Sequence, residues 1–280
     1  MEEAEFYSDS CGYFEGLISE EVIFKLPEED ECSGIVSDCF PEKKLLYPKA
    51  DPQEIIYASL LEMGYRRSGN IVYQAVCPGC RKCKGIRVPA DRFIPSKSQR
   101  RVLRKNSDIE ITLCQSPEDF VTDEKIALFQ KYDGRHNPGK TADAESAEQV
   151  LVNINGLDAE GKKSYHGSFN MDFRINGRLI GVSVLDRALD SLSSVYFYFD
   201  TAEDILPRSV GVFSVLKEIE ACRGEIFGGT LKAGWYYLGY YIEDCRKMNY
   251  KAQYNPHQLL DIGGKWKYDG GKNEASRKDG

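Results

Sequence analysis

The hydrophobic pattern of the first third of the chain predicts short elements around a cysteine-rich turn. Residues 51–64, DPQEIIYASLLEMG, predict a helix with Asp51 as its cap, Pro52 at its first position and Gly64 as its end. Residues 65–76 and 85–93 have the β-branched and aromatic composition of strands, and they flank the turn. Residues before position 46 give only weak strand signals.

Three helices are predicted next. Residues 96–106, SKSQRRVLRKN, have a helical pattern and are strongly basic. Residues 116–132 predict a capped amphipathic helix that leads into a turn-rich GRHNPGK segment, and residues 144–155 predict a weaker helix.

The pattern then changes to long alternating strands. An Asn-Gly pair at Asn176–Gly177 joins two apolar runs, which is the strongest short signal for a hairpin. The expected order is strand, hairpin, strand, long helix, strand, short helix, over residues 165–175, 178–189, 193–200, 207–224, 233–242 and 243–254.

This order is typical of a mixed α/β (α+β) fold of the acetyltransferase (GNAT) type, in which a splayed sheet receives a donor where the long helix begins. We predict an N-terminal domain over residues 1–115, a GNAT-like catalytic domain over 116–268 and a flexible tail over 269–280. Residues 263–280 hold too few apolar side chains to pack, so we expect them to fray.

Composition narrows the class of protein. Hydrophobic residues make up 41% and charged residues 29%, as in ordinary soluble proteins. No apolar run is long enough to span a membrane, and the acidic N-terminus lacks the features of a secretory signal, so we expect a cytoplasmic protein and a monomer. The formal net charge of −7 argues against nonspecific coating of nucleic acid. Residues 77–105 are nevertheless strongly basic and contain a single acid, Asp91. This concentration of positive charge predicts a local binding site for phosphate groups.

Three cysteines at two-residue spacing give the most specific motif, Cys77-Pro78-Gly79-Cys80-Arg81-Lys82-Cys83. Thiolates on a tight turn can converge on zinc or an iron–sulfur cluster. Cys11 is the natural fourth ligand, with Cys32 or Cys39 as rivals. A reduced turn without metal and a redox-sensing disulfide remain alternatives.

Two anion sites are candidates for tRNA or donor binding. In the basic helix, a hydroxyl-bearing start and guanidinium groups suit phosphate binding, although a solvated helix face is the alternative. Its candidate residues are Ser96, Lys97, Ser98, Gln99, Arg100, Arg101 and Arg104. The turn Arg208-Ser209-Val210-Gly211 opens the long helix, where free N–H groups attract the phosphates of acyl-CoA or of a tRNA acceptor end. We name Arg208, Ser209 and Gly211 there.

The aromatic strand and the segment after it supply further candidates, although many of these aromatic side chains must belong to the core. Lys247, Tyr250 and Lys251 are candidates for binding an acidic acceptor, and Tyr240 is a candidate catalytic residue. Arg135 and His136 are further acceptor candidates. Asp186, which follows an apolar run, is the candidate proton acceptor.

Three separate motifs resemble the arginyl-tRNA–protein transferase family, and its bacterial aspartate/glutamate leucyltransferase branch in particular. They are VCPGCRKCKGIRVPADRFIPSKSQRRVLRKN, the SSVYFYFD and PRSVG pair, and WYYLGYYIEDCRKMNYKAQYNP. The resemblance runs from Cys11 to about Trp266.

The resemblance implies a cysteine-bearing N-terminal domain, an acetyltransferase-like domain, and transfer of leucine or arginine from its tRNA to a protein with an N-terminal Asp or Glu in the N-degron pathway. Cys11 matches the family's N-terminal cysteine, and the triple cysteine matches its cluster, with which some members bind zinc or an iron–sulfur cluster. The chemistry itself requires no cofactor. Phe14 stands where eukaryotic members have a second cysteine, and the family's Arg-His-x-x-Gly-Gly turn appears here as Arg135-His136-Asn137-Pro138-Gly139-Lys140, which departs from that pattern.

Two alternatives remain at the level of sequence. An acyl-CoA-dependent acetyltransferase would share the fold and the Arg208 turn, and a noncatalytic zinc module that binds RNA would explain the cysteines and the basic helix.

Overall fold

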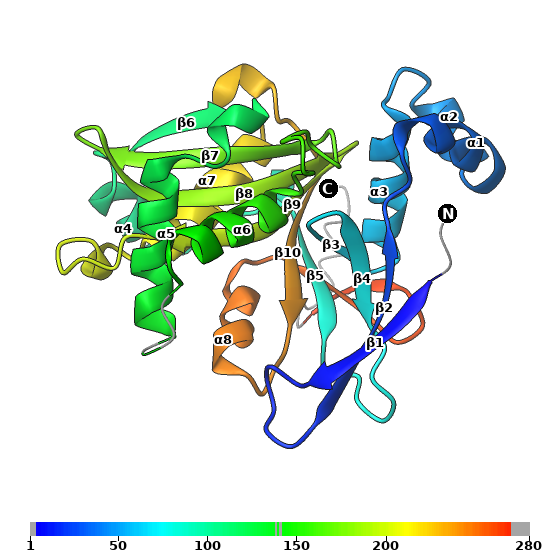
Figure 1. Ribbon diagram of the computed structural model, residues 1–280, viewed down its shortest axis with the longest axis horizontal. Coiled ribbons are helices and arrows are strands. Elements are labelled where there is room, and N and C mark those ends of the chain that lie inside the picture. The colour runs from blue at the N-terminus through cyan, green and yellow to red at the C-terminus, as the bar shows by residue number, and fades with distance from the viewer. Residues whose placement is uncertain (1–3, 138, 140–141, 270–280) are drawn as a thin grey trace, which may run out of the picture.

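An eight-stranded sheet forms the centre of the protein in a computed structural model that describes residues 4–137, 139 and 142–269 (Figure 1). The strand order is β12-β11-β5-β10-β9-β8-β7-β6. The bounds are β5 Lys84–Pro89, β6 Glu110–Cys114, β7 Ser168–Ile175, β8 Arg178–Ala188, β9 Ser191–Phe199, β10 Trp235–Tyr241, β11 Gln258–Leu260 and β12 Trp266–Tyr268. All pairs are antiparallel except β9 with β10, which is parallel.

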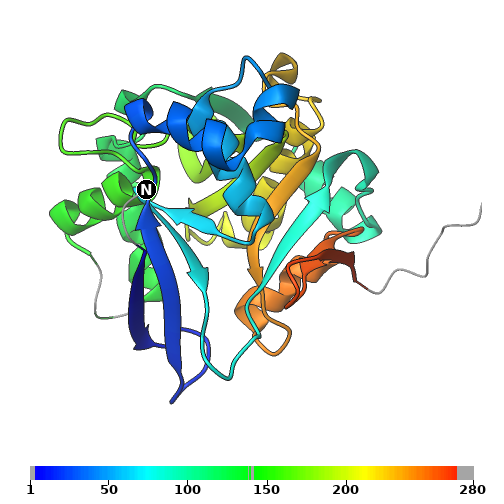
Figure 2. The ribbon, with the colours of Figure 1, turned by 90° about the vertical axis from the view of Figure 1, so that its right-hand side faces the viewer.

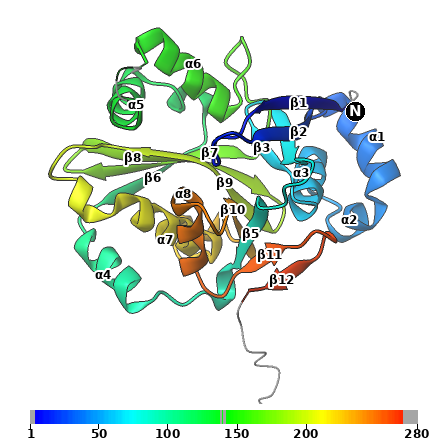
Figure 3. The same cartoon turned by 90° about the horizontal axis from the view of Figure 1, so that it is seen from below.

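Helices cover both faces of this sheet (Figure 3). On one face lie α5 (Asp123–His136) and α6 (Ala144–Asn155), whose Phe129 and Leu151 pack with Val182 of β8. On the other lie α7 (Val210–Cys222) and, against it, α4 (Lys97–Lys105). The strands β7 to β10 are largely buried, and their burial includes polar side chains such as Asn170 and Asp172 of β7 and Ser193 of β9.

A second, four-stranded sheet has the order β1-β2-β4-β3, from β1 (Glu5–Ser10), β2 (Ile18–Lys25), β3 (Arg66–Ser68) and β4 (Ile71–Ala75). The helices α1 (Glu29–Cys39), α2 (Pro41–Leu46) and α3 (Pro52–Glu62) precede β3. The buried side of α3 packs with Val72 of β4 and with Ala188 and Tyr237 of the large sheet, so the two sheets share a core.

Several predicted elements are confirmed, each through a local cap or turn. The Asp51 side chain accepts from Gln53 N at the start of α3, and Gly156 ends α6 in the left-handed conformation. Asn176 and Gly177 both have positive φ, 49° and 81°, as a two-residue hairpin turn between β7 and β8 requires. The mixed α/β class is confirmed.

Other predictions are wrong in detail. The helix predicted over residues 116–132 begins only at Asp123, because Thr122 is its cap, and it extends to His136, so that it includes the first three residues of the segment that we expected to be a turn. The long helix begins at Val210 and not at Pro207, since Leu206–Arg208 form a 3-10 turn. The helices α1 and α2 were not predicted.

The expected fraying of residues 263–280 is wrong for its first part. Trp266–Tyr268 form β12, paired with β11, and the Trp266 indole donates to the Glu62 carbonyl at 2.9 Å. Figure 2 shows β11 and β12, in red, beside β5, in cyan. Residues 270–280, most of the predicted tail, lie outside the described residues.

The division of the chain at residue 115 stays a prediction. The strands β5 and β6 precede that position, yet both belong to the eight-stranded sheet. The large sheet therefore takes strands from both sides of the predicted boundary.

None of the described helices has the length and apolar character needed to cross a membrane.

Candidate active site

The strands β9 and β10 part at the centre of the large sheet. They pair over three residues, Trp235–Tyr237 with Ser191–Ser193. Beyond Tyr237 the register of β10 against β5 shifts, and Gly239 adopts a φ of +78°, which side chains rarely tolerate. The next carbonyl of β9, that of Ser194, accepts a hydrogen bond from the Arg66 guanidinium. An arginine of the small sheet thus replaces β10 as the partner of β9.

Two buried cations lie at this parting of the strands. Arg66 is only 6% exposed and Lys251 only 8%. Lys251 Nζ donates to the Tyr240 carbonyl at 2.8 Å, and Arg66 Nη1 has no hydrogen-bond partner among the described residues. Burial, and then the positive charge of Arg66, lower the pKa of Lys251 to about 7. The sequence indicated Lys251 as a candidate for binding the acceptor. It did not indicate Arg66, because the Arg66-Arg67 pair belongs to no motif.

A buried carboxylate lies on the α7 side of the same strands. Glu218 of α7 is 1% exposed; its Oε1 accepts from Ser183 Oγ at 2.6 Å, and its Oε2 accepts from the Tyr236 hydroxyl. Burial raises the pKa of Glu218 in spite of these donors, so its proton is held more tightly than that of an exposed glutamate. Sequence reasoning missed Glu218, because an acid within an apolar helix gives no sign of which partners it meets.

Asp186, the candidate proton acceptor, is held in a buried ion pair. Its Oδ1 lies 2.6 Å from Arg67 Nη2 and accepts from Ser168 Oγ at 3.0 Å, and its Oδ2 accepts from Arg67 Nε at 2.8 Å. The side chains of Asp186 and Arg67 are both 0% exposed. A carboxylate held in this way cannot reach a substrate amine unless the ion pair breaks.

Tyr240, the other candidate catalytic residue, is also largely buried. Its hydroxyl accepts from Ala75 N at 3.2 Å, and burial raises its pKa, so it stays protonated at neutral pH. Tyr240 lines two cavities, both of which are also lined by Cys77, Cys80 and Cys83.

The two candidate anion sites, the basic helix α4 and the turn before α7, lie next to each other in the structure. Lys105 Nζ and Asn106 Nδ2, at the end of α4, donate to the carbonyls of Pro207 and Arg208 at 2.7 and 2.9 Å. Arg208 itself pairs with Asp108 at 2.8 Å, and its hydrogen bond lowers the pKa of that carboxyl. Ser209 adopts a left-handed conformation before α7, with Gly211 in the first turn of that helix.

The basic residues of α4 face outward beside this turn. Ser96 and Gln99 form a capping box, which commits Gln99 to holding the helix start and leaves it 2% exposed. The exposed residues of α4 and its cap are Ser96, Lys97, Ser98, Arg100, Arg101, Arg104 and Lys105. Among the described residues Lys97, Arg101 and Arg104 have no ion-pair partner, and Arg100 donates only to the Pro95 carbonyl.

The remaining acceptor candidates are exposed. Lys247 and Tyr250 are exposed on α8 (Arg246–Asn249) and just after it, beside buried Lys251. Arg135 and His136 are exposed in the last turn of α5, where His136 Nδ1 lies 2.8 Å from the Tyr132 carbonyl.

All four candidate metal ligands, Cys11, Cys77, Cys80 and Cys83, line one cavity of about 320 Å³, and none forms a disulfide. Burial, and then the neighbouring thiols, raise the pKa of Cys83 to about 12. In the part of the chain that the structure describes, no three metal-binding side chains stand in a coordinating arrangement. The donor type therefore suits a soft metal, but the geometry shown here is not that of a formed site.

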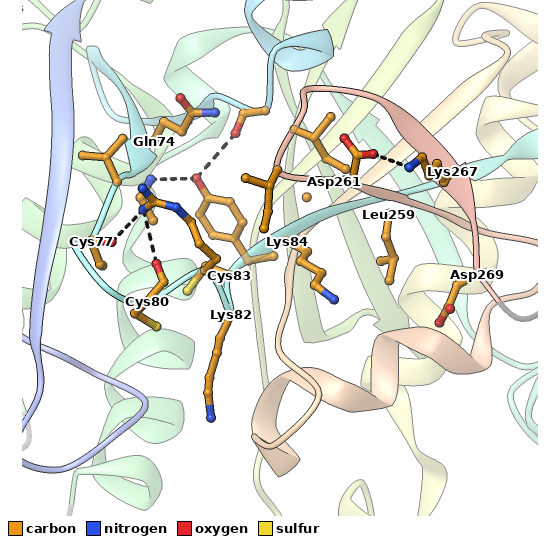
Figure 4. A pocket seen from close by; sticks show the side chains of 18 of the residues that line it. Gln74, Cys77, Cys80, Lys82, Cys83, Lys84, Leu259, Asp261, Lys267 and Asp269 are labelled. Carbon is orange, nitrogen blue, oxygen red and sulfur yellow. Dashed lines mark hydrogen bonds and ion pairs between the residues drawn. The ribbon is translucent and has the colours of Figure 1, made fainter.

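A larger cavity of about 660 Å³ lies on the other side of the triple-cysteine turn (Figure 4). Lys82 and Lys267 at its rim are paired with Asp244 and Asp261, at 2.7 and 2.6 Å. Arg81 donates to the carbonyls of Cys77 and Cys80 and so braces the turn.

Comparison with known proteins places both halves of the chain in one family. The family description "Arginine-tRNA-protein transferase, N terminus" matches residues 9–101, and "Arginine-tRNA-protein transferase, C terminus" matches residues 124–261. An aspartate/glutamate leucyltransferase of Aeromonas hydrophila is 36% identical over 75% of this chain and 80% of that protein. One of Hahella chejuensis is 32% identical over 85% of this chain and 94% of that protein.

Likeness to solved structures is distant. A ribosomal-protein-alanine N-acetyltransferase of Brucella melitensis biovar Abortus covers 40% of this chain and 71% of that one, with 16% identity and a TM-score of 0.25. A score this low does not establish a shared fold.

The matches span the cysteine turn, the basic helix start and the parting strands together, which neither an acyl-CoA acetyltransferase nor a noncatalytic RNA-binding module explains. The chain belongs to the arginine-tRNA–protein transferase family, and it is an aminoacyltransferase.

Proposed function

We propose that this enzyme moves leucine, or alternatively arginine, from its charged tRNA to the α-amine of proteins that begin with Asp or Glu. The observation that carries the proposal is the row of exposed basic side chains on α4, fixed beside the start of α7. Such a row binds phosphate without reading bases. The similarity to aspartate/glutamate leucyltransferases favours leucine as the donated amino acid.

The reaction needs no covalent enzyme intermediate. The neutral α-amine of the acceptor attacks the ester carbonyl that joins the amino acid to the terminal ribose. The new C–N amide bond forms as the ester C–O bond breaks, the amine loses a proton, and the ribose hydroxyl leaves with one. An ester is already activated, so the enzyme contributes mainly proximity and orientation.

The parting of β9 and β10 is the proposed centre of a GNAT-like catalytic domain. Where two parallel strands separate, their backbone N–H and C=O groups have no partner on the neighbouring strand and can form hydrogen bonds with a substrate. In this proposal the acceptor enters between the strands, and the tRNA end approaches from α4 and α7. Cytoplasmic tRNA is the donor pool, and a monomer suffices.

The cysteine turn has a structural role in this proposal. Cys11, Cys77, Cys80 and Cys83 would hold a zinc ion or an iron–sulfur cluster, which would fix the hairpin of β1 and β2 to β4 and β5. No step of the transfer passes through that group.

The test is a transfer assay with leucyl-tRNA and arginyl-tRNA, each labelled in the amino acid, and peptides that begin with Asp, Glu, Lys or Ala. We expect label on the Asp and Glu peptides only, and the label that moves identifies the donor. Label on none of the four peptides from either tRNA, with folded and reduced enzyme, would refute the proposed function.

A further inference from the structure

Burying two cations without a carboxylate partner is costly, and this cost needs an explanation. A charged group taken out of water loses hydration free energy that only a counter-charge or several hydrogen bonds restore. Among the described residues neither Arg66 nor Lys251 takes part in an ion pair, and Arg66 Nη1 has no hydrogen-bond partner. Elsewhere in the same structure the buried Arg67 and Lys125 are each paired, with Asp186 and Asp172.

The two cations approach one point on the backbone. A methyl group built on Gly239 would lie 3.4 Å from Lys251 Nζ and 4.0 Å from Arg66 Nη2. The two charges come from distant parts of the chain, β3 and the 3-10 turn Tyr250–Gln253, and they meet where β10 leaves β9. Two cations around a side-chain-free backbone position form a site of the right chemistry for a carboxylate.

We propose that Arg66 and Lys251 together bind the side-chain carboxylate of the acceptor's N-terminal Asp or Glu, and so determine the enzyme's preference for acidic N-termini. This inference rests on the proposed function. The fork of Arg66 offers Nη1 to one carboxylate oxygen, and Lys251 offers Nζ to the other. The α-amine of the acceptor, only a few bonds from this carboxylate, is thereby held in a fixed direction for attack.

A peptide with an N-terminal Asn presents an uncharged amide in place of the carboxylate of Asp, so the positive charges of Arg66 and Lys251 would stay without a counter-charge. Hydrogen bonds to charged groups are worth more than neutral ones, so we expect a discrimination of about tenfold or more between Asp and Asn at the N-terminus. Lys247 and Tyr250, which precede Lys251 in the same segment, are exposed.

The pH dependence of this discrimination gives a second signature. The charged and titratable groups that face Lys251 are Arg66 of β3 and Cys245, which precedes α8; Met248 Sδ and the Tyr240 carbonyl are uncharged contacts. Since the pKa of Lys251 is lowered to about 7, its charge is present below neutral pH and is lost above it. The preference for Asp over Asn should therefore fall as the pH rises through and beyond 7, while the part due to Arg66 persists.

The experiment measures equilibrium binding of two peptides, identical except for an N-terminal Asp or Asn, to the full-length protein by calorimetry at pH 6.5 and pH 9. The variant is Lys251→Met, which keeps the volume and removes the charge. The control is Lys232→Met, which removes an exposed lysine whose side chain lies against Gly224 and not against Gly239. Thermal melts establish that each variant is folded, and Arg66→Gln serves as a second variant.

The wild type and Lys232→Met should bind the Asp peptide about tenfold or more tightly than the Asn peptide at pH 6.5, and less selectively at pH 9. Lys251→Met should reduce the preference at pH 6.5 to about threefold or less, weaken Asp binding only, and show no change with pH. An unchanged preference in folded Lys251→Met and Arg66→Gln would overturn the inference, and so would an equal loss of binding for both peptides. Because binding is measured without tRNA, its result is independent of whether the transfer assay succeeds.

Discussion

At the scale of single residues, burial separates side chains of the same chemical type into different roles. Arg67 and Arg66 are neighbours in one strand and point to opposite faces, as strand geometry requires. Arg67 finds Asp186 and forms a closed ion pair, whereas Arg66 reaches the Ser194 carbonyl and keeps one N–H group unpaired. The charge of Arg67 is therefore compensated within the protein, whereas the charge of Arg66 is not.

The Arg67–Asp186 pair yields a prediction that separates a structural role of Asp186 from a catalytic one. Asp186→Asn should destabilise the protein by about 3–5 kcal/mol, because it leaves the buried Arg67 charge without a counter-charge. Urea unfolding measures this. The double variant Arg67→Met with Asp186→Leu should recover much of the loss, since it buries no charge.

The rate of transfer by the folded fraction of Asp186→Asn tests the other role. We expect that rate to stay within about threefold of wild type, because a carboxylate sealed by Arg67 takes no proton from substrate. Unchanged stability together with a rate reduced by about a hundredfold or more would instead make Asp186 the proton acceptor.

At the scale of elements, α4 combines an inner face that packs with an outer face that is charged. Val102 and Leu103 pack on the core beside α7, and Gln99 closes the capping box with Ser96. Lys105 and Asn106 tie the end of the helix to the turn before α7. The helix therefore keeps its position without using the exposed arginines, which remain available for phosphate.

Replacing two of those arginines should change binding and leave folding intact. Arg100→Ala with Arg101→Ala should weaken tRNA binding and make the slope of log affinity against log salt less negative by about 2. Its thermal midpoint should stay close to wild type, since both side chains are exposed. The measurement is a tRNA-binding titration at several salt concentrations.

The matched control is Lys162→Ala with Lys232→Ala, which removes the same charge from exposed positions elsewhere. It should change the slope little. An equal change in both double variants would mean that net charge, and not the position of α4, governs tRNA binding.

At the scale of the whole molecule, β5 connects segments that are far apart in the sequence. Arg87 of β5 lies over the rings of Trp235 and Trp266, at 3.9 and 4.4 Å from their centroids, and donates to Tyr237 and Gln258. One side chain thus joins β10, β11 and β12 to a strand that precedes residue 115.

A fragment of residues 116–280 should therefore fail to form the native sheet. Without β5, the strands β10 and β11 lose their common neighbour, and β7 loses β6. Exposed strand edges and lost core contacts make a cooperative fold unstable. We expect a broad thermal transition by circular dichroism, where the full chain shows a sharp one. A sharp transition for the fragment would establish residues 116–280 as an independent domain.

The sequence by itself determined the elements whose signals are local. The cap at Asp51, the turn at Asn176–Gly177 and the capping box of Ser96 and Gln99 act within three residues along the chain, so side-chain type and spacing predict them. The motifs also indicated the correct family, because each keeps its residue types together in a short segment.

Only the tertiary structure decided which side chains meet. The meeting of Arg66 with Lys251, the sealing of Asp186 by Arg67 and the gathering of Cys11 with the triple cysteine all join residues more than sixty positions apart. Strand register and the bulge at Gly239 fix those meetings, and neither leaves a periodic signal in the sequence. A charged residue in an apolar run looks the same along the chain whether it will be paired, like Asp186, or left for a ligand, as we propose for Arg66.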